Sequence, residues 1–170
     1  MVFLDETSAY LDLSEGYGRA AKGERVIDNA PKGKKKRASL LAAVTVRGLA
    51  GAHCLVHPEN VNKAAFTSYL KTLLPMLEAG SILVMDNWRV HLGTDVRDLV
   101  EGHHCTILYL PAYSPDYNPI ELLFSKIKAF VKRLRPLTLP ELIQAFVDAV
   151  LSVTSDDAKN TFEHCGYVEQ

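Results

Sequence analysis

The sequence predicts an α/β domain built on a mixed five-stranded sheet, in which the first three strands are antiparallel, the later ones are parallel, and helices flank the sheet. Three observations predict it. Short apolar runs typical of strands gather near the amino terminus. Amphipathic helical segments then alternate with further short apolar runs. At 170 residues the chain is long enough for one domain with a sizeable core.

The antiparallel strands are predicted from apolar runs near the amino terminus. Residues 1–5 are an apolar run that ends in an acid, and residues 14–38 have the glycines, charges and proline of a hairpin or a long mobile loop. Residues 39–46 form a buried strand, residues 47–48 a turn, and residues 50–57 the returning strand of a hairpin.

The first helix follows this hairpin. Asn60 or Asn62 caps it, because an Asn side chain accepts hydrogen bonds from the free N–H groups of a first turn. Pro75 should kink the helix or split off its last turn, and Gly80 ends it. Its apolar face has the spacing of one helix side and is made by Ala65, Phe66, Tyr69, Leu70, Leu73, Leu74 and Leu77.

Strands that alternate with helices form the parallel part of the predicted sheet. Residues 82–85 are fully apolar, as is typical of a strand at a sheet centre. Thr94 caps a short helix that Gly102 closes, and residues 105–110 form another buried strand. Strands joined through helices run parallel, so this half extends the sheet in parallel.

Two more helices complete the single domain expected over residues 1–170. Asn118 is the expected N-cap of the first, with Pro119 at its first position. Thr138 opens the second with a capping-box pattern, within a C-terminal helical extension over residues 136–170. An antiparallel trio followed by alternating elements matches a ribonuclease H-like α/β fold.

Composition and charge narrow the class of protein. The chain is 48% hydrophobic and 23% charged, and no window approaches the ~20 consecutive apolar residues of a membrane span. No secretory signal and no disulfide spacing are visible, so a cytoplasmic protein is expected. The net charge is −1, and the cationic runs at residues 32–37 and 126–135 are of a kind that is usually solvated.

Three acids stand at the ends of predicted elements. Asp5 and Asp86 each follow an apolar strand, and Glu121 lies in the first turn of the helix that Asn118 caps. Each has a structural explanation, since Asp often ends strands and Glu can close a capping box. Converging carboxylates repel and call for hard divalent cations bound through oxygen, which points to metal-assisted phosphoryl transfer.

The motifs around these acids resemble the DDE triad of mariner-type transposases, especially of their bacterial insertion-sequence branch. Phe3-Leu-Asp5-Glu-Thr resembles the first motif of that family, and Val84-Met-Asp86-Asn87-Trp-Arg-Val-His91 resembles the second. Leu110-Pro-Ala-Tyr-Ser-Pro-Asp-Tyr-Asn-Pro-Ile-Glu121 resembles the third and is the most specific. The spacing between Asp86 and Glu121, which residues 87–120 occupy, is the length that characterises much of this superfamily.

The resemblance implies a DDE superfamily endonuclease that cuts the DNA ends of an insertion sequence and transfers the freed strands to target DNA. Asp5, Asp86 and Glu121 would be the catalytic residues and would bind two Mg²⁺ ions, with Mn²⁺ as a substitute. Asp5 would lie between the metals. The expected partner is DNA, bound by a homodimer.

Two side chains near these acids each have two possible roles. Asn87 would orient Asp86 or a metal-bound water, or else bind backbone. His91 would approach the scissile phosphate or lie in the core as a neutral histidine. Glu6 is expected outside the site, because successive strand residues point to opposite faces.

The helix that carries Glu121 supplies the expected DNA contacts. Lys128, Lys132 and Arg135 continue the face that bears Glu121 and are candidates for phosphate contacts.

Family members normally carry a helix-turn-helix region before the catalytic core, and this chain is expected to lack it because the first motif starts at residue 3. There are three explanations: the chain is a fragment, a gene remnant, or the product of the downstream reading frame of a split element. In the third case, a polypeptide from the upstream frame would carry the helix-turn-helix region. The alternative function is a catalytically silent DNA-binding or partner module of a split transposase. A phosphatase with an aspartyl nucleophile is disfavoured, because Thr7 stands where its second acid would be needed.

Overall fold

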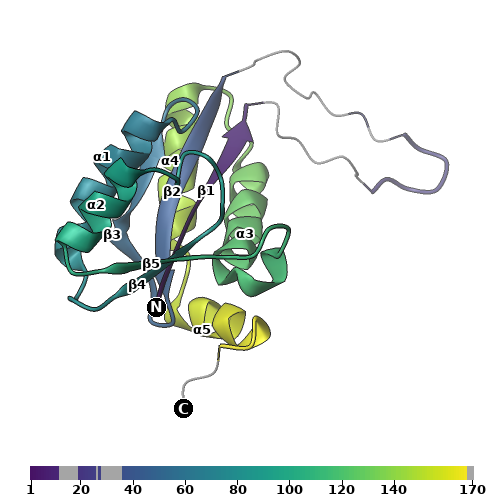
Figure 1. Ribbon diagram of the computed structural model, residues 1–170. Coiled ribbons are helices and arrows are strands. Elements are labelled where there is room, and N and C mark those ends of the chain that lie inside the picture. Colours follow the sequence, from purple (N-terminus) through teal and green to yellow (C-terminus); the bar gives the residue numbers. More distant parts are fainter. Residues whose placement is uncertain (12–18, 26, 28–35, 168–170) are drawn as a thin grey trace.

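The computed structural model describes residues 1–11, 19–25, 27 and 36–167, apart from the side chains of residues 50–53. Much of the predicted loop at 14–38, including the lysine run at 32–35, lies outside the described residues. The described strands form one sheet in the order β3-β2-β1-β4-β5 (Figure 1). They are β1 (Val2–Tyr10), β2 (Arg37–Thr45), β3 (Gly48–His57), β4 (Ile82–Met85) and β5 (Thr106–Tyr109).

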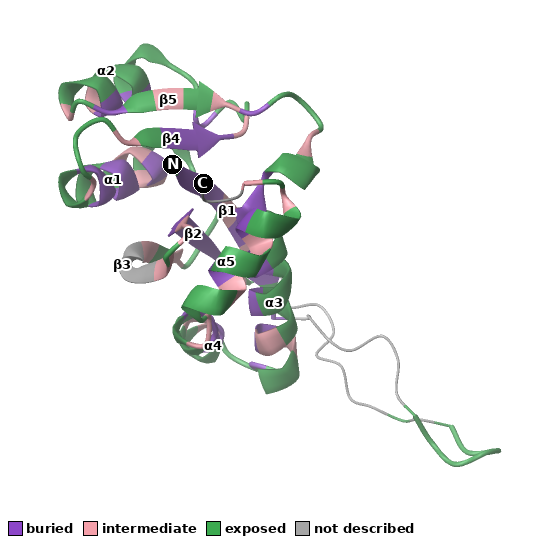
Figure 2. Cartoon of the chain, turned by 90° about the horizontal axis from the view of Figure 1, so that it is seen from below, coloured by how far each residue is buried: buried purple, intermediate pink, exposed green. Residues whose placement is uncertain are grey.

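Helices cover both faces of this sheet. Figure 2 shows α1 and α2 on one side and α3, α4 and α5 on the other. The described helices are α1 (Lys63–Leu73), α2 (Thr94–Gly102), α3 (Pro119–Leu134), α4 (Leu139–Leu151) and α5 (Ser155–His164), with short 3₁₀ turns η1 (Leu74–Met76) and η2 (Pro115–Tyr117).

The pairing of the strands confirms the predicted ribonuclease H-like fold. β2 is antiparallel to both β1 and β3, whereas β4 is parallel to both β1 and β5. The prediction that the first strand ends at Asp5 was wrong. β1 continues to Tyr10, because its second half stays paired with β2.

Side chains alternate across β1 and β2 and so feed two hydrophobic cores. Phe3 and Leu40 belong to the core under α3, α4 and α5, and Leu4 and Leu41 belong to the core under α1 and α2. This alternation fixes the direction of every polar residue on β1. Asp5 therefore points towards α3, whereas Glu6 points to the opposite face.

Local signals placed most of the helices correctly. Asn62 caps α1, where its side chain accepts from the N–H of Ala65, and η1 splits off at Pro75 as expected. Thr94 is not a cap but the first residue of α2, because Gly93 occupies the cap position with φ of 132°.

The carboxyl-terminal region holds one more helix than the pattern indicated. Thr138 caps α4 as predicted, where its hydroxyl accepts from the N–H of Glu141. α5 was missed, although Thr154 and Asp157 form a capping box at its start. Its mixed composition hides the short apolar face made by Ala158 and Phe162.

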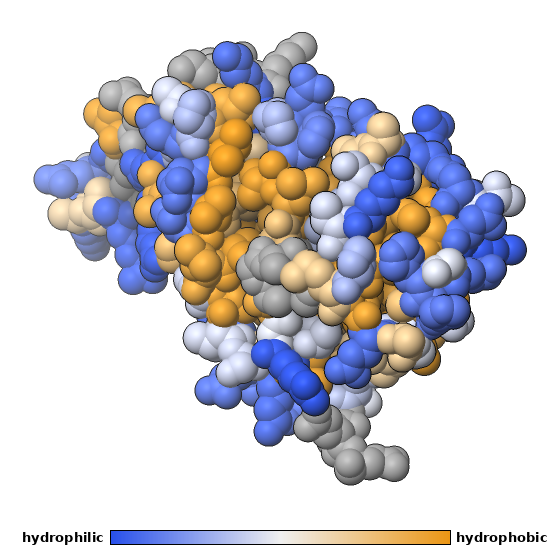
Figure 3. All heavy atoms as spheres, turned by 90° about the vertical axis from the view of Figure 1, so that its left-hand side faces the viewer, coloured by the Kyte–Doolittle hydropathy of each residue, from blue (hydrophilic) through white to orange (hydrophobic). Residues whose placement is uncertain are grey.

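The two sheet edges leave apolar side chains exposed. β5 was expected to be buried, but it is an edge strand beside β4, and Leu108 is 50% exposed. On the side of α1, α2 and β3, hydrophobic side chains gather in the middle of the face (Figure 3). Leu55 of β3 and Val147 and Leu151 of α4 are exposed.

Within the residues that the structure describes, no helix is both long and apolar enough to span a bilayer.

Candidate active site

One pocket of about 510 Å³ is lined by all three predicted acids, Asp5, Asp86 and Glu121. β1 supplies Asp5, the residue after β4 supplies Asp86, and the first turn of α3 supplies Glu121. Parallel neighbours bring β1 and the carboxyl end of β4 together, and the segment after β5 leads into α3. The topology thus gathers acids that are far apart in the sequence.

Asp5 is the buried member of the three, with 6% exposure. Its Oδ1 accepts from the N–H of Glu6 at 2.8 Å, and its Oδ2 accepts from Nδ2 of Asn118 at 2.9 Å. The pKa of Asp5 is raised to about 8, chiefly by burial and also by the nearby carboxylates of Glu6, Glu121 and Asp86. A charged Asp5 therefore costs folding free energy that a bound cation would offset.

Asn118 was predicted only as a helix cap. It does occupy the N-cap position of α3, but its side chain makes no cap hydrogen bond and turns to Asp5 instead. Its Oδ1 is buried and has no hydrogen-bond partner among the residues that the structure describes. Asn118 therefore links two of the acids: its side chain binds Asp5, and it lies one helical turn before Glu121.

Asp86 is held from the opposite direction. Its Oδ1 accepts from the N–H of Trp88 at 2.9 Å and lies 2.7 Å from Nδ1 of His91. These contacts lower the pKa of Asp86, so this carboxylate stays charged where Asp5 does not.

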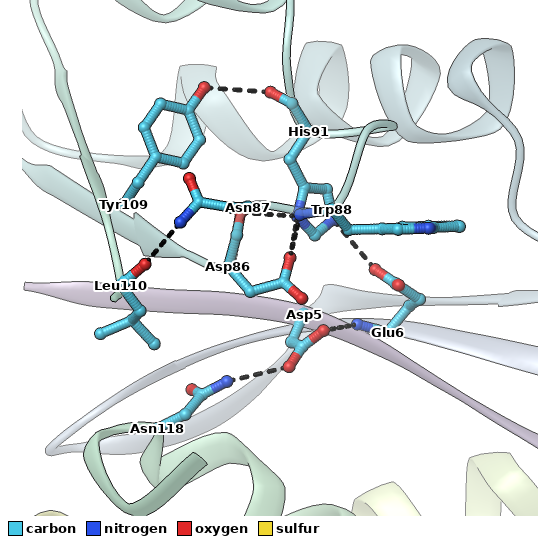
Figure 4. A network of polar contacts seen from close by, with 9 residues as sticks. All are labelled: Asp5, Glu6, Asp86, Asn87, Trp88, His91, Tyr109, Leu110 and Asn118. Atoms are coloured by element: carbon cyan, nitrogen blue, oxygen red, sulfur yellow. Dashed lines mark hydrogen bonds and ion pairs between the residues drawn. The ribbon is translucent and has the colours of Figure 1, made fainter. Parts of the chain in front are cut away.

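His91 lies in the core, as one of its two predicted roles has it, but its ring is paired with carboxylates rather than neutral. It is fully buried against the ring of Phe66, which leaves no surface for a phosphate. Burial lowers the pKa of His91, but the hydrogen bonds of Asp86 and Glu6 outweigh it and raise the pKa to about 10. The ring is therefore a buried cation between two carboxylates (Figure 4).

Glu6 reaches this network although it was expected to lie outside the site. It does point to the opposite face from Asp5, and there its Oε2 lies 3.0 Å from Nε2 of His91. His91 comes from the loop after β4, which lies on that face and still reaches Asp86. Contacts through His91 therefore link Glu6, on one face of β1, to Asp86 at the end of β4.

Two further residues line the pocket. Nδ2 of Asn87 donates to the carbonyl of Leu110 at 2.7 Å, so its backbone-binding reading holds and it ties the end of β4 to the segment before α3. Glu121 closes no capping box, and its exposed side chain makes no hydrogen bond to any described residue. Its carboxylate is thus free to bind a ligand.

The predicted DNA-contacting cations lie along α3 at increasing distance from Glu121 in sequence. Lys128 is exposed and lines a second pocket that adjoins the first at Trp88. Lys132 is half-buried, and Arg135 is the left-handed C-cap of α3 with φ of 51°.

The donor set fits a hard divalent cation, although no three acid, histidine or cysteine side chains within the described ranges form a ready ligand cluster. Carboxylate oxygens are the ligands that Mg²⁺ and Mn²⁺ prefer. Asp5 is buried with a raised pKa, Asp86 is charged and half-exposed, and Glu121 is unengaged. These three would hold the ion, with small side-chain rotations towards it.

Comparison with known proteins identifies the family. A sequence model of DDE superfamily endonucleases matches residues 1–143. Among curated proteins, the search finds no match.

Solved structures of Mos1 transposase share the fold. The Mos1 strand transfer complex has a TM-score of 0.77 and 19% identity, covering 95% of this chain and 50% of that one. The Mos1 mariner paired end complex with Mn has a TM-score of 0.76 and 18% identity, covering 97% and 53%. The catalytic domain of Mos1 mariner transposase has a TM-score of 0.68 and 17% identity, covering 97% and 78%. The chain thus spans about half the length of the chains in the first two.

Asp5→Asn should stabilise the protein in the absence of divalent cations. The folded-state pKa of about 8 means that wild type loses stability as pH rises from about 4 to 8, and the neutral amide does not. The gain at pH 8.5 should be on the order of 3 kcal/mol in urea unfolding and should shrink at pH 5. Asp98→Asn on exposed α2 is the control. A variant no more stable than wild type at pH 8.5 would contradict the raised pKa of Asp5.

Glu6→Gln should weaken the support of His91. Because the pKa of His91 is raised, its ion pairs stabilise the fold fully below about pH 6.5, and this stabilisation is lost as pH rises through about 10. The variant should lose on the order of 1–3 kcal/mol at pH 6.5 and less at pH 10.5, measured by urea unfolding. Glu101→Gln, an exposed change on α2, should lose nothing. A loss that is the same at both pH values would exclude the charged histidine.

Proposed function

We propose that this chain, which belongs to the DDE superfamily of endonucleases, is the catalytic core of a transposase that cuts DNA and joins the cut strand to target DNA. One observation carries the proposal: Asp5, Asp86 and Glu121, from three separate elements, line a single pocket. Carboxylates at the corresponding motif positions are what the chemistry of this superfamily requires.

Asp5, Asp86 and Glu121 bind Mg²⁺, with Mn²⁺ as a substitute, in this proposal. A divalent cation held there would supply the activation of a water or a 3′-hydroxyl and the stabilisation of the leaving oxygen. The chain itself contributes positioning. Asn118 holds Asp5 in one orientation, and His91, fixed by Glu6, holds Asp86, so that little reorganisation is needed for reaction.

DNA is the proposed partner. The solved Mos1 structures include a strand transfer complex and a paired-end complex with a transposon end. Lys128, Lys132 and Arg135 lie on the helix that begins beside the catalytic pocket, where cations contact phosphates without reading sequence. A homodimer on DNA completes the proposal.

A catalytically silent module is the less favoured function. Loss of activity usually leaves its mark on the acids themselves, and here all of them line the pocket. The burial of Asp5 makes its charged form costly to the fold, and a silent module would have no use for that cost. These two features favour an active enzyme.

Nicking of supercoiled plasmid is the direct test. Wild type should nick in Mg²⁺ or Mn²⁺ and not in EDTA, and Asp86→Asn should lower the rate by at least about 100-fold, since loss of a mere supporting contact already costs up to that much. Asp98→Asn, purified identically, should keep the wild-type rate. Equal nicking by wild type and Asp86→Asn would end the enzyme proposal.

A further inference from the structure

A second pocket, of about 530 Å³, adjoins the catalytic one and has no place in the proposed metal chemistry. The two pockets share Trp88 as a wall. The second is also lined by Ser8 of β1, Arg37 of β2 and Lys128 of α3. A groove therefore leads from the three carboxylates along the second half of β1.

The unequal lengths of two neighbouring strands create this groove. β1 pairs with β2 along Phe3–Tyr10, but it pairs with β4 only at Val2 and Phe3, because β4 ends at Met85. Within the described part of the chain, one edge of β1 thus has no strand partner from Asp5 onwards. Backbone groups along such an edge are ready to bind another extended chain.

Trp88 stands at the junction of the two pockets and is the single tryptophan of the chain. Its ring is edge-on to His91, at 5.7 Å between centroids, while its backbone N–H binds Asp86. The residue is nevertheless 38% exposed. A partly exposed aromatic ring, on a residue whose backbone binds Asp86, is a platform on which a base can stack.

The charges of the pocket fit an anionic backbone. Lys128 is exposed, and Arg37 is held in place by Tyr10, whose hydroxyl accepts from Nη1 at 2.7 Å. Glu6 also lines the pocket, but its carboxylate is paired with the buried imidazole of His91 (Figure 4). The cations therefore face the groove without an unpaired acid opposite them.

We propose that this second pocket binds an unpaired nucleotide of the DNA strand next to the scissile phosphate, with its base stacked on Trp88 and its phosphate on Lys128. The inference rests on the proposed function. It assigns to Trp88 a role in holding single-stranded DNA. Duplex DNA does not fit this arrangement, because a paired base has no free face for the ring.

Binding of a fluorescein-labelled oligothymidylate, followed by anisotropy in EDTA, tests the pocket without cleavage. Trp88→Ala should weaken binding by roughly 5- to 100-fold, whereas Trp88→Phe should keep most of it. Lys128→Gln should also weaken binding and should reduce the salt dependence by about 0.7 in slope. Lys71→Gln, an exposed change on α1 that lines neither pocket, should bind as wild type does. Neither change at Trp88 should lower affinity for a duplex of the same length.

Wild type gives a second readout, independent of the stability of any variant. Unlabelled oligothymidylate should quench the fluorescence of Trp88, because stacking places a base on the indole. Unchanged fluorescence at saturation, unchanged affinity of Trp88→Ala, or an equal loss of duplex binding would each overturn the inference. Plasmid nicking with unchanged affinity of Trp88→Ala overturns this inference alone. Binding that depends on Trp88 without nicking supports the pocket and counts against the proposed function.

Discussion

Bringing three carboxylates into one pocket, with one of them buried, is the constraint on which the rest of this structure depends. Each acid meets it in a different way. Asp5 is buried, has its pKa raised to about 8 and is held by Asn118. Asp86 keeps its charge because His91, itself fixed by Glu6, is a buried cation beside it. Glu121 remains in solvent at the start of α3. The fold therefore holds a site whose full charge is tolerable only with a cation bound.

The sheet explains why the site lies where it does. β4 ends early beside a longer β1, so the acid after β4 meets the acid in the middle of β1. The same mismatch leaves an open edge on β1, and the second pocket lies along it. One feature of strand length thus produces both the catalytic pocket and the groove that leads from it. Trp88 connects the two, because it lines both pockets and its backbone N–H binds Asp86.

Sequence patterns predicted the elements and the acids better than they predicted the partners of those acids. Asp86 and Glu121 follow from strand and helix boundaries, which are local properties. The roles of Asn118 and Glu6 depend on which side chain lies opposite in the folded chain, and no local pattern records that. His91 was expected to be either neutral or functional, because burial and pairing with two carboxylates act together only in three dimensions. The same reasoning explains the extension of β1, which the strand opposite it decides.

Anomalous scattering from crystals soaked in Mn²⁺ tests the central claim most directly. The account predicts manganese peaks in the catalytic pocket, within coordination distance of oxygens of Asp5, Asp86 and Glu121, and their loss in crystals of Asp86→Asn. Crystals that bind manganese only elsewhere, or a pocket in which one of the three carboxylates stays turned away from the metal, would contradict it.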